Sequence, residues 1–456
     1  MARAGFGIFF VPASSLFTFD EPGEFWGFST ETDMQTTSGN AFTPGKLLRS
    51  PFPNGLTQAT GSSQGLLSAI GNSPFQIWPS GPHPTGYKQN WSLDFQYEFK
   101  PGTVLDVGYL GFGARKLNFG NPSLNANQLP DLYLSMGNAH RLASVMPASS
   151  PLSDPTNISQ AQLLVPFPQF LGINYARSLP GATDNYNALS IRFTQRFSTG
   201  LSLLASYQWS KNLDDASEDQ GWAIFSNQWR DFYNRKLEYS VSAHDVPQSF
   251  VTSLVYELPV GRGKKYGSNL NSVADKVIGG WQVASIVKLQ SGFPFIVNAP
   301  GNIGNYGFGR TAPNLVSTKA LFPSGFTRTP EHWFNTCTLQ ADGASKTGCS
   351  GNDSVAWVVP QDFQIGNAPR YVSNLRGDWM RNTDLSLSKY FRVTERLRVQ
   401  FRGDFLNAWN TPFFGNGDGD LANGGPDSFV TSSTFGQIFG TYNSPRTIQG
   451  ALKVEF

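Results

Sequence analysis

A serine in the pattern of a hydrolase nucleophile lies near the start of the chain. Residues 61–65, GSSQG, match GxSxG, in which a strand, a sharp turn and a helix expose a nucleophilic serine. Here the pattern lies inside the polar segment QATGSSQG, and no apolar strand leads into it. We therefore interpret Ser63 as a linker serine, and the sequence predicts no enzyme.

Residues that bind metals are sparse. The four histidines, His83, His140, His244 and His332, stand far apart, without the spacing of a metal-binding pair. Two acidic clusters offer oxygen ligands of the kind that Ca²⁺ takes. The clusters are Asp214, Asp215, Glu218, Asp219 and Asn416, Asp418, Asp420. The second departs from the EF-hand pattern, which needs glycine where Leu421 stands. Solvated carboxylates are the default interpretation, calcium is the alternative, and no cofactor is predicted.

A basic glycine-rich segment, GRGKK at residues 261–265, offers phosphate contacts. It lacks the GxxxxGK[ST] pattern of a phosphate loop, and we interpret it as a basic turn at lipid headgroups. Aromatic residues Trp222, Trp229 and Tyr233 would either stack on a sugar or peptide or pack loops together. The net charge of +2 provides no field that favours nucleic acid as a partner.

Both cysteines, Cys337 and Cys349, lie in the segment CTLQADGASKTGC. The spacing does not suit a zinc site. In an oxidising compartment the pair would form a disulfide across a loop of about a dozen residues, and the chain-entropy gain would be about 3 kcal/mol. Two free thiols are the alternative.

The elements that carry these residues have a period of two. Apolar and polar residues alternate in residues 89–99, 190–197, 201–211, 396–405 and 448–456, which predicts strands with two unlike faces. Weaker candidates are residues 3–10, 103–112, 250–258, 281–290 and 379–391. These roughly ten strands have the length of about 9–11 residues that crosses a membrane with tilt.

Short and long connections alternate along the chain. Short turns join the strands at KPG, STG and RVTE, and a moderate connection spans residues 259–280. Between these hairpins lie long segments at about residues 11–88, 113–184, 212–245, 291–378 and 410–446. Alternate connections of an up-and-down sheet lie on opposite sides, and short periplasmic turns with long outer loops characterise outer-membrane barrels.

Aromatic residues are predicted at both ends of the strands, as an outer-membrane barrel requires. Trp91, Trp209, Trp379 and Trp409 adjoin long loops, and Tyr97, Phe99, Tyr390 and Phe391 adjoin short turns. The alternating charged residues are expected to face a wet lumen. They are Asp94, Glu98, Arg192, Arg196, Lys288, Arg398, Arg402 and Asp404.

The composition agrees with a barrel. Aromatic and charged residues each make up 14%, while an average soluble protein has about 25% charged residues. No segment approaches the roughly 18 consecutive apolar residues of a spanning helix. The aromatics are expected to face lipid rather than crowd a core. The start, MARAGFGIFFVPASS, is interpreted as a strand, with a signal peptide as the alternative.

Several segments resemble the barrel of Oar-like TonB-dependent outer-membrane transporters. They are DNYNALSIRFTQRFSTGLSLLASYQWSKNLDDAS, HDVPQSFVTSLVYELPVGRGKK, GGWQVASIVKLQSGFPF, NTDLSLSKYFRVTERLRVQFRGDFLNAWNTPFFG and SPRTIQGALKVEF. The opening RAGFGIFF looks like an inner strand of that barrel. The resemblance is most specific from about residue 184 onward.

The resemblance implies a barrel of roughly 22 strands, closed by a plug domain and powered through the TonB system. Compared with that pattern, we expect residues 1–456 to hold neither the plug nor the TonB-contacting segment, and only about half of the strands. We therefore expect residues 1–456 to form the C-terminal part of one such barrel in a Gram-negative-type outer membrane. Phe456 would serve as the terminal signal for the barrel-assembly machinery.

The predicted fold class is all-β, an antiparallel up-and-down transmembrane β-barrel of which this chain holds about ten strands. The predicted function is non-enzymatic uptake or binding of an unidentified ligand through loops and lumen. Outer-membrane lipid and the barrel-assembly machinery are the expected partners, with the TonB system acting only through the absent N-terminal part. The alternative is a secreted or surface β-rich binding protein, such as a lectin or adhesin.

Overall fold

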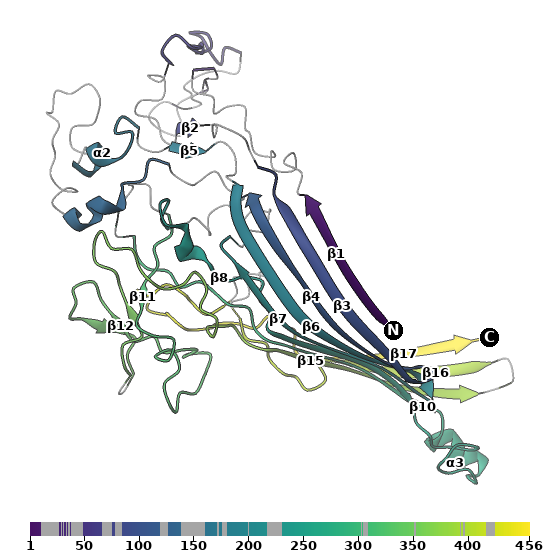
Figure 1. The fold of residues 1–456 in the computed structure, drawn as a ribbon. Coiled ribbons are helices and arrows are strands. Elements are labelled where there is room, and N and C mark those ends of the chain that lie inside the picture. Colours follow the sequence, from purple (N-terminus) through teal and green to yellow (C-terminus); the bar gives the residue numbers. More distant parts are fainter. Residues whose placement is uncertain are drawn as a thin grey trace.

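One large antiparallel sheet, here called the wall, dominates the computed structural model (Figure 1). The structure describes residues 1–10, 27–28, 30, 32, 34, 37, 49–65, 75–77, 84–118, 126–137, 160–170, 173–175, 180–198, 200–216, 230–301, 303, 309–350, 353–392, 394, 397–415 and 425–456. Within these residues, no helix has the length and apolar character needed to cross a bilayer.

Ten strands follow one another across the wall in chain order, and neighbours are antiparallel. They are β1 (Ala2–Phe10), β3 (Tyr87–Lys100), β4 (Thr103–Asn118), β6 (Pro180–Ser198), β7 (Leu201–Asp214), β9 (Gln248–Glu257), β10 (Trp281–Gln290), β15 (Met380–Arg392), β16 (Arg398–Leu406) and β17 (Thr447–Glu455). The predicted strands and the up-and-down order are confirmed. Among the described strands, β1 and β17 each have one neighbour, so the curved sheet is open.

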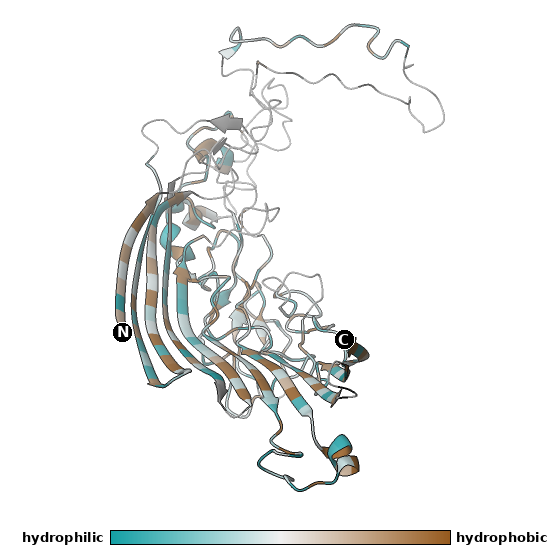
Figure 2. Ribbon diagram, turned by 90° about the vertical axis from the view of Figure 1, so that its right-hand side faces the viewer, coloured by the Kyte–Doolittle hydropathy of each residue, from teal (hydrophilic) through white to brown (hydrophobic). Residues whose placement is uncertain are grey.

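The two faces of the wall differ in polarity because side chains alternate along each strand. Residues directly opposite in the register share a face. Asp94 lies opposite Gly108, which lies opposite Ser190, whereas Phe95 lies opposite Val107 on the other face. The hydropathy bands along the strands in Figure 2 reflect this alternation. We call the two sides the polar face and the apolar face.

Two of the short connections, β3–β4 and β6–β7, are turns that depend on glycine. Gly102 and Gly200 have φ of 79° and 82°, a backbone conformation that residues with a Cβ adopt reluctantly. The connection between β9 and β10 adds a helix, α3 (Ser272–Ile278), whose N-cap Asn271 accepts a hydrogen bond from the Ala274 amide. This helix was not foreseen, and it joins antiparallel strands rather than a βαβ unit.

Two long connections, β10–β15 and β16–β17, pack into one compact unit, here called the loop body (Figure 1). It contains a four-stranded sheet of β11 (Asn314–Leu315), β12 (Thr338–Leu339), β13 (Lys346–Thr347) and β14 (Trp357–Val358). Phe334 and Trp357 are completely buried at its centre, and Phe435 packs edge-on against both. The expectation that the aromatics avoid a core is therefore wrong for these loops.

The remaining described elements lie in the other long connections or beside the wall. They are β2 (Phe75–Ile77), η4 (Asp131–Met136), α2 (Gln160–Leu164), β5 (Ile173–Tyr175), η5 (Arg235–Glu238) and β8 (Ser240–Val241). Strands β2 and β5 pair with each other, and β8 pairs with the last two residues of β7. The described parts of the five long connections thus lie at one end of the wall (Figure 1).

Candidate functional site

The polar face of the wall holds the charges expected in a lumen. The register and the alternation within each strand place Asp94, Glu98, Arg192, Arg196, Lys288, Arg398, Arg402 and Asp404 on it. Between them stand small polar residues, such as Ser206 opposite Arg192. Nε of Arg402 donates to Oδ1 of Asp404 at 2.8 Å, and the Arg402 side chain is half exposed. Such wet, paired charges cost little to hold on a surface.

Three of the apolar side chains on the polar face stand on adjacent strands near its centre. Leu204 lies opposite Ser253, which lies opposite Ile286, and Val251 stands two positions away on β9. Leu204, Val251 and Ile286 are 44%, 38% and 51% exposed. Apolar groups on three adjacent strands make a patch that a partner surface would cover favourably.

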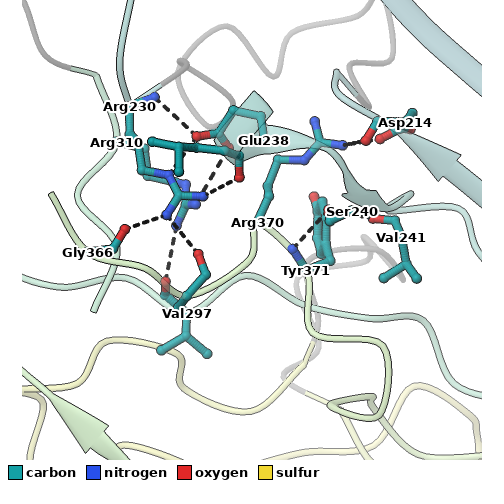
Figure 3. A network of polar contacts seen from close by, with 12 residues as sticks. Asp214, Arg230, Glu238, Ser240, Val241, Val297, Arg310, Gly366, Arg370 and Tyr371 are labelled. Carbon is teal, nitrogen blue, oxygen red and sulfur yellow. Dashed lines mark hydrogen bonds and ion pairs between the residues drawn. The ribbon is translucent and has the colours of Figure 1, made fainter. Parts of the chain in front are cut away.

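The loop body contacts the polar face at the end of the strands from which the long connections emerge. Ser210, Asn212 and Asp214 continue this face of β7 and are buried. Arg370 of the loop body donates to the Asp214 carboxylate (Figure 3). Nη2 of Arg376 donates to Oδ2 of Asp245 at 2.5 Å. The ion pairs therefore fasten the loop body to the wall.

Asp245 links Arg376 of the loop body to strand β7 of the wall. Its Oδ1 accepts a hydrogen bond from the Asn212 amide at 2.6 Å, and its backbone oxygen accepts one from Nη1 of Arg376 at 2.7 Å. A small apolar cluster of Val241, Ala243 and Tyr371 supports the same junction. The junction is largely buried and hydrogen-bonded, which favours a fixed geometry over a loose one.

A buried carboxylate between two arginines lies next to this junction. Glu238 Oε1 accepts from Nε of Arg230 at 2.7 Å, and Nη2 of Arg310 lies 3.7 Å from Oε2 (Figure 3). Arg230 also donates to the backbone oxygens of Gly366 and Ala368, each at 2.7 Å. We call Arg230, Glu238 and Arg310 the clamp, because it ties the β7–β9 connection to the loop body.

Burial and charge act in opposite directions on the clamp. Burial alone would raise the pKa of Glu238, but the guanidinium groups of Arg230 and Arg310 outweigh it and hold this pKa below its ordinary value. Burial lowers the pKa of Arg310 to about 10, although Glu238 opposes the shift. Glu238 and Arg310 are therefore both charged at neutral pH, so the clamp is an ionic contact.

A second contact joins the β4–β6 and β7–β9 connections. Nε2 of Gln128 donates to Oδ1 of Asp231 at 2.8 Å, and the hydroxyl of Tyr233 donates to the Gln128 backbone oxygen at 3.2 Å. Burial and the neighbouring Asp231 carboxylate raise the pKa of Asp131 to about 6. We therefore expect this contact to depend on pH near 6.

The cysteines lie within the loop body. Cys337 and Cys349 form a disulfide that closes the hairpin between β12 and β13. Cys337 is fully buried beside the aromatic core. The disulfide therefore stabilises the loop body rather than the wall.

The remaining candidate chemistry does not converge on one site. Ser63 lies in a turn and its hydroxyl donates to the Thr60 backbone oxygen at 2.6 Å. Asp214 pairs with Arg370, and the described residues hold no group of metal-ligating side chains. Outside the described residues lie His83, His140, Trp222, Trp229, Glu218, Asp219 and residues 416–421.

The aromatic ends of the strands are largely as expected. Tyr97 and Phe99 pack edge-on with ring centroids 4.9 Å apart at the turn end of β3. Tyr390 instead lies on the polar face, where its hydroxyl accepts from Nε2 of Gln400 at 3.1 Å. Even-numbered β15 residues belong to that face, so the alternation within the strand already decided it.

Sequence reasoning missed the arginines that hold the loops. Arg230, Arg310 and Arg370 are far apart in the chain, and each stands in a segment without periodicity. Their burial depends on contacts between three connections. The local signal was limited to one aromatic or glycine neighbour of each arginine, namely Trp229, Gly309 and Tyr371.

Comparison with known proteins bears on the whole chain. Residues 1–449 match the family model described as an outer membrane beta barrel domain. Comparison with curated proteins finds no relative. Solved structures that are similar include the receptor FpvA of Pseudomonas aeruginosa bound to heterologous pyoverdine (9% identity, TM-score 0.31, 82% of this chain and 27% of that chain). Another is the outer-membrane transporter YddB of Escherichia coli (8% identity, TM-score 0.34, 84% and 34%).

The chain spans about a quarter to a third of the length of these structures. The family model, by contrast, covers nearly all of it, and the predicted fold class and outer-membrane location are confirmed. The antiparallel wall, with one polar and one apolar face, agrees with part of the wall of such a barrel. The chain therefore belongs to the family of outer membrane beta barrel domains.

Proposed function

We propose that residues 1–456 form part of the barrel wall of a TonB-dependent receptor, which takes up a ligand without enzymatic chemistry. The supporting observation is the loop body, which is clamped over the loop end of the polar face. A solute that approaches the lumen from outside meets this body first. The loops would therefore select the ligand, and the charges of the polar face would line its route.

A plug domain in the lumen completes the proposal. Leu204, Val251 and Ile286 would face water in an open pore, at a cost of about 25 cal/mol for each Å² of apolar surface. A folded plug that packs against β7, β9 and β10 would remove this cost. The TonB system would act on the plug and would not contact the wall directly.

Closure of the barrel also belongs to the proposal. The outer edges of β1 and β17 carry backbone groups that a bilayer would leave without partners. We propose that further strands of the receptor pair with these edges. Phe456 is almost fully exposed directly after β17, where the barrel-assembly machinery would read it.

A permeability assay tests the plugged barrel. Leu204→Asp in the full receptor should loosen the plug and sensitise cells to a large antibiotic that an intact outer membrane excludes. The matched control is Ser206→Asp, which adds the same charge two residues away on the same face and should leave sensitivity unchanged. Equal sensitivity of both variants and the parent receptor would contradict a plug on this patch. Recovery of the receptor with soluble proteins would contradict the membrane function altogether.

A further inference from the structure

The β9–β10 connection extends beyond the turn end of the wall and has an unusual charge (Figure 1). Between residues 259 and 280 stand four cations, Arg262, Lys264, Lys265 and Lys276, and one carboxylate, Asp275. The segment thus has a formal charge of +3, while the whole chain has +2. We call residues 259–280 the foot.

Helix α3 has an apolar side, which carries Val273 and Val277, and a polar side, which carries Asp275. Val273 and Val277 are one helical turn apart and therefore share a side, and they are 75% and 66% exposed. Asp275 lies on the other side, where its Oδ1 accepts a hydrogen bond from the Arg262 amide at 2.6 Å. The basic turn is therefore held to the polar side of the helix, and the valines remain uncovered.

The end of α3 is attached to the apolar face of the wall. Trp281 and Lys389 are opposite each other on that face, in register with Phe401. Nε1 of Trp281 donates to the Val277 backbone oxygen at 3.0 Å. Nζ of Lys389 donates to the same oxygen at 3.2 Å and to that of Gly279.

The contacts of Lys389 indicate that the foot is attached to the apolar face of the wall. An ammonium on the lipid-facing side of a barrel is costly unless it finds partners. Here the helix end supplies carbonyl oxygens, and Lys389 is only 3% exposed. The end of α3 thus completes the apolar face, and the exposed Val273 and Val277 stand on the helix that is attached to this face.

We propose that the foot binds the phospholipid leaflet on the turn side of the membrane. Val273 and Val277 enter the boundary between headgroups and acyl chains, and Arg262, Lys264 and Lys265 contact lipid phosphates. Two observations favour lipid over a protein partner: the foot is continuous with the lipid-facing side of the wall, and its charge is complementary to anionic headgroups. Amphipathic helices with basic surroundings bind membranes in this way.

Fluorescence quenching in vesicles tests the foot. The full receptor carries a single added cysteine, Val273→Cys or Val277→Cys, labelled with an environment-sensitive dye and inserted into phosphatidylethanolamine–phosphatidylglycerol vesicles. Quenchers attached to the lipid should quench these labels about threefold more strongly than a label at Ser272→Cys, which is exposed on the polar side of α3. In vesicles of phosphatidylcholine alone the difference should shrink, because the basic turn loses its anionic partners.

A label at Phe95→Cys separates the foot from the wall on which it rests. Phe95 lies on the apolar face of β3 and should be quenched by lipid whenever the wall is inserted. If the Phe95 label meets lipid while the Val273 and Val277 labels are quenched only by aqueous iodide, the foot is solvated and the inference is wrong. Labels shielded from both quenchers would show a protein partner and would also overturn it. A Phe95 label quenched by iodide would overturn both the foot and the proposed orientation of the wall.

Discussion

Buried charges, rather than exposed ones, hold the loops in place. Glu238 is removed from water, and its carboxylate is tolerated because two guanidinium groups surround it. A buried ion pair adds little to stability compared with an apolar replacement, but loss of one partner is expensive. The clamp therefore favours the one loop arrangement in which Glu238 lies between Arg230 and Arg310.

Glu238→Gln should open the loops while leaving the wall intact. The substitution leaves Arg230 and Arg310 buried without their carboxylate, which should cost about 3 kcal/mol in the local opening free energy. Hydrogen exchange of residues 230–240 and 366–370 would measure it. The matched control is Glu257→Gln, because Glu257 is half exposed and lies 3.8 Å from Lys264, and its effect should stay below about 0.5 kcal/mol. Equal protection in both variants would contradict the clamp.

Mild acid should tighten the contact between the β4–β6 and β7–β9 connections. Asp131 has a pKa of about 6 in the folded protein against an ordinary value of 3.8, so the folded state binds its proton more tightly. The contribution of this group is fully present below pH 3.8 and is lost as the pH rises through 6. Hydrogen exchange of residues 127–133, corrected for the intrinsic pH dependence, should show greater protection at pH 5 than at pH 7. Asp131→Asn should abolish that difference, and a persistent difference would assign it to another group.

The strands were predictable because their pattern is local. Within about ten residues, each wall strand alternates between apolar and polar side chains. Pairing in the observed register then places like side chains of neighbouring strands on the same face. The loop body was not predictable, because Phe334, Trp357 and Phe435 meet across a hundred residues of chain without a periodic pattern. Helix α3 did have a signal, in Asn271 as a capping residue followed by Val273 and Val277 at helical spacing.

Gly111 of β4 provides room for an aromatic residue of the neighbouring strand. A Cβ at this position would lie 2.7 Å from both Nε1 of Trp91 and the Tyr186 backbone oxygen. Gly111→Ala should therefore displace the Trp91 ring or the β4–β6 pairing, at a cost of about 1–3 kcal/mol. Gly113→Ala is the control, since its Cβ would meet Trp91 and Asn185 at 3.7 Å or more. The temperature at which heating changes the gel mobility of the folded barrel should be lower for Gly111→Ala than for the parent receptor. It should be unchanged for Gly113→Ala.

At the scale of the whole molecule, strict alternation of connections gives the wall two distinct ends. The exposed turn between β12 and β13 belongs to one end and the foot to the other. An epitope inserted after Asp342 should therefore bind antibody on intact cells, whereas one inserted after Ser268 should bind only after the outer membrane is permeabilised. Binding of both epitopes on intact cells would contradict the proposed orientation. Neither insertion interrupts a wall strand, so both variants should assemble.

The shared core of the loop body has a consequence for how such receptors diversify. Val430, Phe435 and Ile438 of one connection pack with Phe295, Phe334 and Trp357 of the other. Exchange of residues 291–378 alone with another receptor would leave half of a hydrophobic core without its counterpart. New specificity would then require the two connections to be inherited together, as a single module attached to four neighbouring strands, β10, β15, β16 and β17. Grafting experiments should treat them as one module.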